Sequence, residues 1–190
     1  MSNPKINQLH SDDRPFNHYF QFGDIENIFD TLLSSWDSCA ERYGTEIVDY
    51  FVTLPNLDGN RRFIAAANLV HAIVEVDERI AKSNEKVTVP FLKAIRSASA
   101  PYSKLNSKVL ESSLEAIEAT RHSITHPQSI LKNKAAHGLD LAHAEAFLDS
   151  VLRCLLWTRL GLSEPEIRAL CLSHPMLNDK LSMNFWREIV

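Results

Sequence analysis

Six consecutive residues, Arg121 through His126, bring together the side chains of this sequence that are best suited to acid–base chemistry. They read Arg-His-Ser-Ile-Thr-His, and Pro127 follows at once. An imidazole has an unperturbed pKa of about 6.5, so it can accept or donate a proton near neutral pH. A guanidinium stays charged, and its fork of N–H groups matches the oxygens of a phosphate. These are the groups needed to cleave a phosphodiester without a metal ion.

Cleavage of RNA by its own 2′-hydroxyl has three requirements, and the hexapeptide contains groups for all of them. A base takes the proton from the 2′-hydroxyl, an acid protonates the leaving 5′-oxygen, and a cation stabilises the charge on the phosphorus oxygens. Histidine suits the first two roles and arginine the third. The hydroxyls of Ser123 and Thr125 are candidates for positioning the phosphate.

The hexapeptide lies at the end of an expected helix, and this sets a geometric condition on its chemistry. His122 and His126 are four residues apart and share a helical face. Arg121 and His126 are five apart, roughly 140° around the axis. Because Pro127 disfavours the helical conformation at His126, we expect the chain to turn there and His126 to swing back towards the guanidinium. Capping is the other explanation, since cationic side chains interact favourably with a helix C-terminus.

The elements that position these residues are predicted to be helices. Apolar residues recur at three- and four-residue spacing in most segments, and only 5 of the 190 residues are glycine. This pattern indicates an all-α fold, and the length fits one domain. We expect an N-terminal arm over residues 1–22 and a single helical domain over 23–190. The expected helices span about 24–36, 47–54, 61–82, 88–99, 103–126, 139–160 and 163–174.

Residues with capping preferences mark several helix ends. Thr88, followed closely by Pro90, is the expected N-cap of the short helix over 88–99. Gly161 is well placed to cap the C-terminus of the helix over 139–160. Ser163 and Glu166 have the spacing of a capping box at the start of the last helix.

Composition limits the class of protein. The formal net charge of −4 argues against a surface covered in basic residues, although a local basic cleft is compatible with that sum. The three cysteines are scattered, without CxxC spacing, and we expect them to be buried apolar side chains in a reducing cytosol. No signal-peptide-like run begins the chain, and no stretch approaches the ~20 apolar residues of a membrane span. We therefore expect a cytoplasmic protein that does not associate with a membrane.

A polar stripe and a basic loop are further candidate sites. His71, Glu75 and Arg79 lie at four-residue spacing on the helix over 61–82. A buried or interfacial charge pair is the favoured explanation, and a supporting role for Glu75 near Arg121 is the sharper alternative. Lys132 and Lys134 are candidates for contacting an RNA backbone, although lysines in loops are usually just solvated.

Zinc is a possibility at the two histidines, because HxxxH on one helical face is a ligand spacing that zinc sites use. His137, His143 and Asp140 follow within the next twenty residues. However, the proline disrupts the helix at the second histidine, and no cysteine lies near. We predict no metal and no cofactor.

Together with the helices on either side of it, the hexapeptide resembles the signature of the HEPN superfamily (higher eukaryotes and prokaryotes nucleotide-binding domains). That signature is an arginine, a polar residue and then a histidine a few positions later. Two other stretches resemble the HEPN domain of ApeA-type anti-phage proteins in particular. One runs from Trp36 to Phe51, and the other begins Arg-Phe-Ile-Ala-Ala-Ala-Asn-Leu-Val-His at Arg62 and continues to Arg79. The resemblance covers roughly residues 16–175.

The resemblance implies a HEPN-like bundle of long antiparallel helices that works as a metal-independent endoribonuclease. It implies a homodimer in which the two signatures face each other, with RNA as substrate and a role in toxin or anti-phage defence. An antitoxin or sensor partner is compatible with such a role. Carried over by position, Arg121 stabilises the pentacoordinate phosphorane and His126 acts as general base or acid. His122 occupies a slot that is most often asparagine in the family, and its auxiliary role stays open.

Other functions are compatible with the same residues. The chain is alternatively a non-catalytic HEPN-like module for binding nucleotide or RNA, or for dimerisation, and an antitoxin-like or adaptor protein is a third possibility. ApeA-type proteins carry a further domain ahead of the HEPN region, whereas this sequence begins almost directly at that region. A stand-alone unit, a fragment and one half of a two-gene system are all open.

Overall fold

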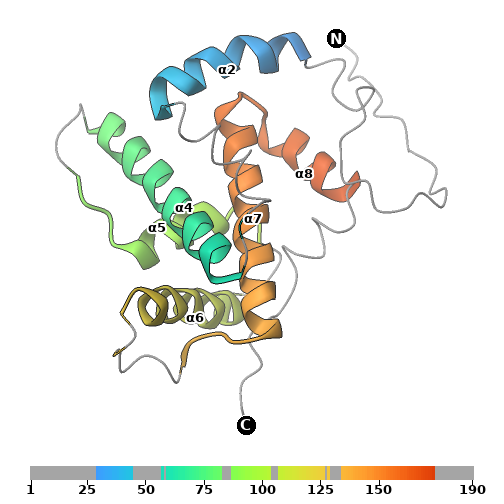
Figure 1. The fold of residues 1–190 in the computed structure, drawn as a ribbon. Helices are drawn as coiled ribbons and strands as arrows, with labels where there is room; N and C mark the ends of the chain where they lie inside the picture. The colour runs from blue at the N-terminus through green and yellow to red at the C-terminus, as the bar shows by residue number, and fades with distance from the viewer. Residues whose placement is uncertain are drawn as a thin grey trace.

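The part of the chain that the computed structural model describes is entirely helical outside its turns. It comprises residues 29–44, 57, 59–82, 87–103, 107–126, 128 and 134–173, with backbone alone over 171–173. Six helices lie in these ranges and no strand does (Figure 1). They are α2 (Phe29–Tyr43), α4 (Gly59–Ala81), α5 (Phe91–Ser99), α6 (Ser107–Thr125), α7 (Leu139–Arg159) and α8 (Glu164–Ser173). The predicted all-α class is confirmed.

The two longest helices, α4 and α7, form the centre of the fold and pack extensively against each other. The buried side chains of α4 recur with helical spacing: Phe63, Ala66, Ala67, Val70, Ile73 and Val74. Opposite them, α7 buries Phe147, Leu148, Val151 and Leu152. Each large apolar side chain that is fully buried stabilises the fold by about 1.5–3 kcal/mol. The small alanines allow the backbone of α4 to approach its neighbours closely.

Helices α5 and α6 pack against α4, and α6 carries the hexapeptide at its end. α5 packs against both α4 and α6, and α6 also contacts α4 and α7. Figure 1 shows α6 lying across the lower ends of α4 and α7. Leu110, Leu114 and Ile117 bury the inner face of α6. The last turn of α6 therefore projects from a helix that is anchored along most of its length.

Most of the expected helix ends agree with the structure, and one N-cap prediction was wrong. Gly161 has φ of 90° and closes α7, with Leu162 N–H donating to Trp157 O and Gly161 N–H to Thr158 O. Pro90, not Thr88, is the N-cap of α5, and no side chain caps that end. Pro90 has extended backbone angles, and its carbonyl accepts the first helical hydrogen bond, from Ala94 N–H at 3.0 Å.

The start of α8 confirms one arm of the predicted capping box. The Glu166 carboxylate accepts from both the backbone N–H and the hydroxyl of Ser163, each at 2.7 Å. These hydrogen bonds lower the pKa of Glu166. The helix ends at Ser173, close to the expected His174.

Several expectations differ from the structure in their boundaries or lie outside its described part. α2 continues to Tyr43 rather than ending near Trp36, α4 begins at Gly59 rather than near 61, and α6 begins at Ser107 rather than at Ser103. Ser103 instead belongs to the turn after α5, where its N–H donates to Ser99 O. The N-terminal arm and the helix expected over 47–54 lie outside the described residues. In the described ranges, the helices are too short or too polar to cross a membrane.

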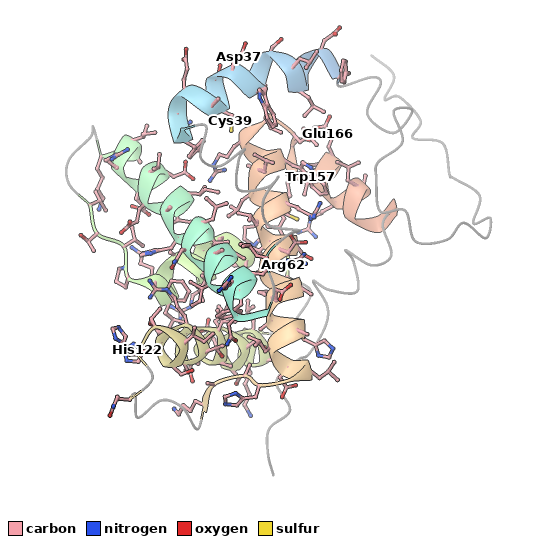
Figure 2. The ribbon with its side chains drawn as sticks, in the orientation of Figure 1. Asp37, Cys39, Arg62, His122, Trp157 and Glu166 are labelled. Carbon is pink, nitrogen blue, oxygen red and sulfur yellow. The ribbon has the colours of Figure 1, made fainter. Side chains whose placement is uncertain are left out.

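One carboxylate, that of Asp77 in α4, joins three helices. The hydroxyl of Tyr43 in α2 donates to it at 2.5 Å, and the guanidinium of Arg159 in α7 donates to its other oxygen, with Nε at 3.0 Å. Arg42 Nη2 lies 3.6 Å from Asp77 Oδ1. Burial, together with the hydrogen bond to Asp77, raises the pKa of Tyr43. Cys39 is buried on the same side of α2, and its burial raises its pKa (Figure 2).

We predict that Asp77→Ala lowers the free energy of unfolding by about 2–4 kcal/mol, because Arg159 stays partly buried without its counter-ion. Asp37→Ala is the matched control, since Asp37 is exposed on the outer side of α2 (Figure 2). We expect it to change stability by less than about 0.5 kcal/mol. Urea unfolding followed by circular dichroism measures both. Equal losses in the two variants would show that Asp77 does not join the helices.

Candidate functional site

The hexapeptide forms the last turn of α6 and the residue after it. The helix ends at Thr125, one residue before His126, as expected ahead of the proline. Helical hydrogen bonding nevertheless includes the next residue, because the N–H of His126 donates to His122 O at 2.8 Å. A proline restricts the backbone angles of the residue before it but leaves that residue's N–H in place, so the turn remains closed.

The structure brings the two imidazoles of the hexapeptide together. The ring centroids of His122 and His126 are 4.8 Å apart, with a tilt of 49° between the rings. Both side chains are exposed, and Figure 2 shows His122 on the outside of the helix assembly, at the end of α6. The expected swing of His126 towards Arg121 is therefore wrong. Helical geometry reaches His126, so its ring meets the side chain four residues earlier.

Arg121 points instead towards α4 and α5. Its guanidinium carbon lies 4.6 Å from the centroid of the Phe91 ring, and its Nε donates to Asn68 Oδ1 at 3.0 Å. Successive residues on a helix are about 100° apart, so Arg121 and His122 leave the helix in different directions. The described contacts of Arg121 join it to neither histidine.

The partners of Arg121 differ in charge from those of other arginines. Three further arginines of the described ranges are partly buried, and each is paired with a carboxylate: Arg62 with Glu145, Arg153 with Asp149 and Arg159 with Asp77. Arg121 is also partly buried, but its described partners, an amide oxygen and an aromatic ring, are neutral. A cation with only neutral partners in such a place is well suited to receive an anion.

The hydroxyls of the hexapeptide donate to the backbone of their own helix. Thr125 Oγ1 donates to Arg121 O at 2.9 Å, and Ser123 Oγ donates to Thr120 O at 3.1 Å. These are bonds from a side chain back to the preceding helical turn, which is a structural role. Because a hydroxyl has a single proton, each of these two groups has no donor left for a phosphate oxygen. In the structure, Thr125 is therefore bonded to its own helix.

Glu75 holds the segment ahead of α5. His71 Nε2 donates to Val89 O at 2.7 Å, and Glu75 Oε1 accepts from Val89 N–H at 3.2 Å. His71 Nε2 and Glu75 Oε1 are 3.6 Å apart, and the rings of His71 and Phe91 pack in a T-shaped arrangement with 5.6 Å between their centroids. These contacts give His71 and Glu75 a structural role, whereas Arg79, the third residue of the predicted stripe, is exposed. Among the described contacts, none joins Glu75 to Arg121 directly; Glu75 bonds Val89, and Arg121 lies on Phe91, two residues further along.

The basic loop is described only at its end. Lys132 lies outside the described residues, whereas Lys134 is exposed. Two residues further on, the N–H of Ala136 donates to the buried hydroxyl of Thr120 at 2.7 Å. That hydroxyl donates in turn to Ala116 O at 2.6 Å, so Thr120 ties the returning chain to α6.

No group of three or more metal-ligating side chains that could hold an ion occurs in the ranges that the structure describes. His137 and His143 do not join the imidazole pair in such a group. Among the described residues, Arg121 contacts an amide and an aromatic ring, and the two imidazoles contact each other.

Sequence reasoning missed Asn68, Phe91 and Thr120. Asn68 carried a usable signal, because it precedes His71 by three residues and extends the polar stripe by one turn. Phe91 carried no such signal, since an aromatic residue at the start of a helix is usually part of the hydrophobic core. The bond from Thr120 to Ala136 spans a loop whose path the sequence does not specify.

We predict that Thr120→Val lowers the free energy of unfolding by about 1–3 kcal/mol, because the buried N–H of Ala136 loses its acceptor. Thr125→Val is the control: it makes the same substitution in the same helix at an exposed hydroxyl, and should cost much less. Amide hydrogen exchange at Ala136 should become faster in Thr120→Val alone. Unchanged exchange there would contradict the role assigned to Thr120.

Comparisons of the chain with protein-family models, with curated proteins and with solved structures find no match. The resemblance to the HEPN superfamily therefore rests on the sequence features that suggested it. Any function must be argued from the arrangement of Arg121 and the two histidines in this fold.

Proposed function

We propose that the chain is a metal-independent endoribonuclease of the HEPN type that acts as a homodimer. One observation carries the proposal: the partly buried guanidinium of Arg121 has neutral described partners, and two exposed imidazoles follow it within five residues. A cation whose described partners are neutral, followed by groups that can exchange protons, meets the chemical needs of phosphodiester cleavage. Arginines that are paired with carboxylates elsewhere in the fold lack this property.

In the proposed reaction, the 2′-oxygen of a ribose attacks the adjacent phosphorus as a base removes its proton. The bond from phosphorus to the 5′-oxygen breaks, and an acid protonates that oxygen. The products are a 2′,3′-cyclic phosphate and a free 5′-hydroxyl. Arg121 donates N–H bonds to the non-bridging oxygens, and His126 serves as base or acid. His122, in contact with His126, is the auxiliary group.

A homodimer would supply what one chain does not bring together. Arg121 and His126 have separate partners within the chain. A second copy facing the first would place an imidazole of one chain near the guanidinium of the other. This arrangement, like a role in toxin or anti-phage defence and an antitoxin or sensor partner, follows from the resemblance and forms part of the proposal.

A binding module is the second candidate, and the direction of Arg121 favours it. The guanidinium lies on Phe91, and the two imidazoles contact each other rather than the guanidinium. A cation held in this way can bind a phosphate of RNA or of a nucleotide without any proton transfer. The two candidates share the anion site and differ in whether His126 reaches the bound phosphate.

Incubation of RNA with the purified protein in excess chelator tests the enzyme proposal. We expect wild type to leave cyclic-phosphate ends. Arg121→Ala and His126→Ala should each lower the cleavage rate by at least about 100-fold, the usual contribution of a phosphate-stabilising cation or of an acid–base group. His137→Ala is the control, because His137 is an exposed histidine outside the hexapeptide. Circular dichroism establishes that each variant is folded.

The same preparations separate the two candidates. Cleavage that survives His126→Ala would contradict the assigned acid–base role. If concentrated wild type, shown to be dimeric by light scattering, binds varied RNAs through Arg121 without cleaving them, the binding module is correct.

A further inference from the structure

The described contacts of Arg121 involve the face of its guanidinium and its Nε–H. Phe91 lies against its face, with 4.6 Å between Cζ and the ring centroid. Asn68 occupies the Nε–H, at 3.0 Å. The N–H groups on the two terminal nitrogens are left to form a fork, which is the geometry that binds two phosphate oxygens at once.

The ring beneath the guanidinium is itself held in place. Phe91 is buried, its ring packs against that of His71 in a T-shaped arrangement, and His71 donates to the carbonyl of Val89, two residues before Phe91. Glu75 accepts the N–H of the same Val89. Hydrogen bonds to the backbone just ahead of Phe91 thus hold the ring against which the guanidinium lies.

The residue at position 68 accepts the Nε–H of Arg121, so its charge adds directly to that of the guanidinium. An aspartate there would accept the same Nε–H bond and also neutralise the guanidinium, as carboxylates do for Arg62, Arg153 and Arg159. An asparagine orients the group and leaves its charge unneutralised. Because arginine offers no acceptor, the atom of Asn68 facing Nε must be the amide oxygen.

We propose that Asn68 is a positioning residue for Arg121, and that its neutrality keeps the guanidinium available for a phosphate of RNA. This inference rests on the proposed function for its ligand, though not on cleavage. It assigns Asn68 no contact with the reacting atoms. Phe91 supplies the second support, beneath the guanidinium plane.

Asn68→Asp tests the proposal, because it preserves the shape of the side chain and the acceptor while adding a carboxylate. The probe is a fluorescent 2′-O-methyl oligoribonucleotide, which lacks the attacking hydroxyl and so cannot be cleaved. We expect Asn68→Asp to bind it about 10-fold more weakly than wild type, as measured by fluorescence anisotropy. The slope of log K against log salt should flatten by about 0.7–1, which corresponds to one lost phosphate contact.

Asn60→Asp is the matched control. It makes the same change of charge in the same helix, at an exposed residue. Eight residues separate the two positions, about 12 Å along the helix axis. That distance exceeds the Debye length of about 8 Å at 0.15 M salt, so Asn60→Asp should leave both the affinity and the slope nearly unchanged.

Stability separates positioning from a purely structural role. In Asn68→Asp, a new ion pair between the introduced carboxylate and Arg121 should leave the thermal midpoint unchanged or raise it slightly, while oligonucleotide binding falls. Phe91→Leu gives an independent check. It keeps an apolar side chain but removes the aromatic face, and should weaken binding in the same direction.

The outcomes distinguish this inference from the proposed function. In one outcome, wild type binds the probe, Arg121→Ala does not, and Asn68→Asp has the same affinity as Asn60→Asp. The inference is then wrong, and the proposed function stands. If Asn68→Asp weakens binding but wild type cleaves no RNA, the inference stands and the binding module is favoured. A wild type that does not bind the probe overturns both.

Discussion

The burial of one face of α4 is the constraint on which the candidate site depends. Phe63, Ala67 and Val70 are fully buried, which fixes the rotation of α4 about its own axis. Once that rotation is fixed, helical periodicity places Asn68, His71 and Glu75 away from the fully buried stripe. The polar stripe then meets the start of α5 and the end of α6. A change in the core of α4 would therefore be felt at Arg121 through the position of Asn68.

Electrostatic pairing distinguishes the site from the rest of the fold. Asp77 gathers a tyrosine and two arginines at the junction of α2, α4 and α7, and Arg96 and Glu111 form a bidentate pair between α5 and α6. Such pairs hold elements together and leave no charge for a ligand. Arg121 departs from this pattern, because its orientation comes from an amide and a ring. Within the described ranges, that departure is the physical basis for placing an anion there.

The helical architecture was largely predictable from the sequence, because it follows from local rules. Apolar spacing predicted α4, α6 and α7. Gly161 predicted the end of α7, because glycine readily adopts the positive φ that the structure shows there. The cap of α5 was mispredicted, because Pro90 already supplies an extended backbone ahead of the helix and leaves Thr88 unneeded. The predicted start of α6 at Ser103 was also wrong, because the N–H of Ser103 bonds Ser99 O in the turn that follows α5.

The candidate site was predictable in its residue types but not in its contacts. The sequence indicated Arg121 and the histidines as candidate site residues. The predicted geometry required His126 to leave the helix in order to reach the guanidinium. The N–H of His126 keeps its helical bond, so that displacement does not occur. The partner of Arg121 lies 53 residues earlier, at Asn68. Contacts over such separations depend on how helices pack, which local patterns do not specify.

The central claim is that Arg121 is a pre-positioned cation awaiting a phosphate, and its Nε–H resonance tests this most directly. In a titration of the nitrogen-15-labelled protein with a 2′-O-methyl dinucleotide, the account predicts that the Arg121 resonance shifts saturably. The resonance of Arg96, which is already paired with Glu111, should stay in place. Shifts at Arg96 equal to those at Arg121, or none at Arg121 at saturating ligand, would contradict the account.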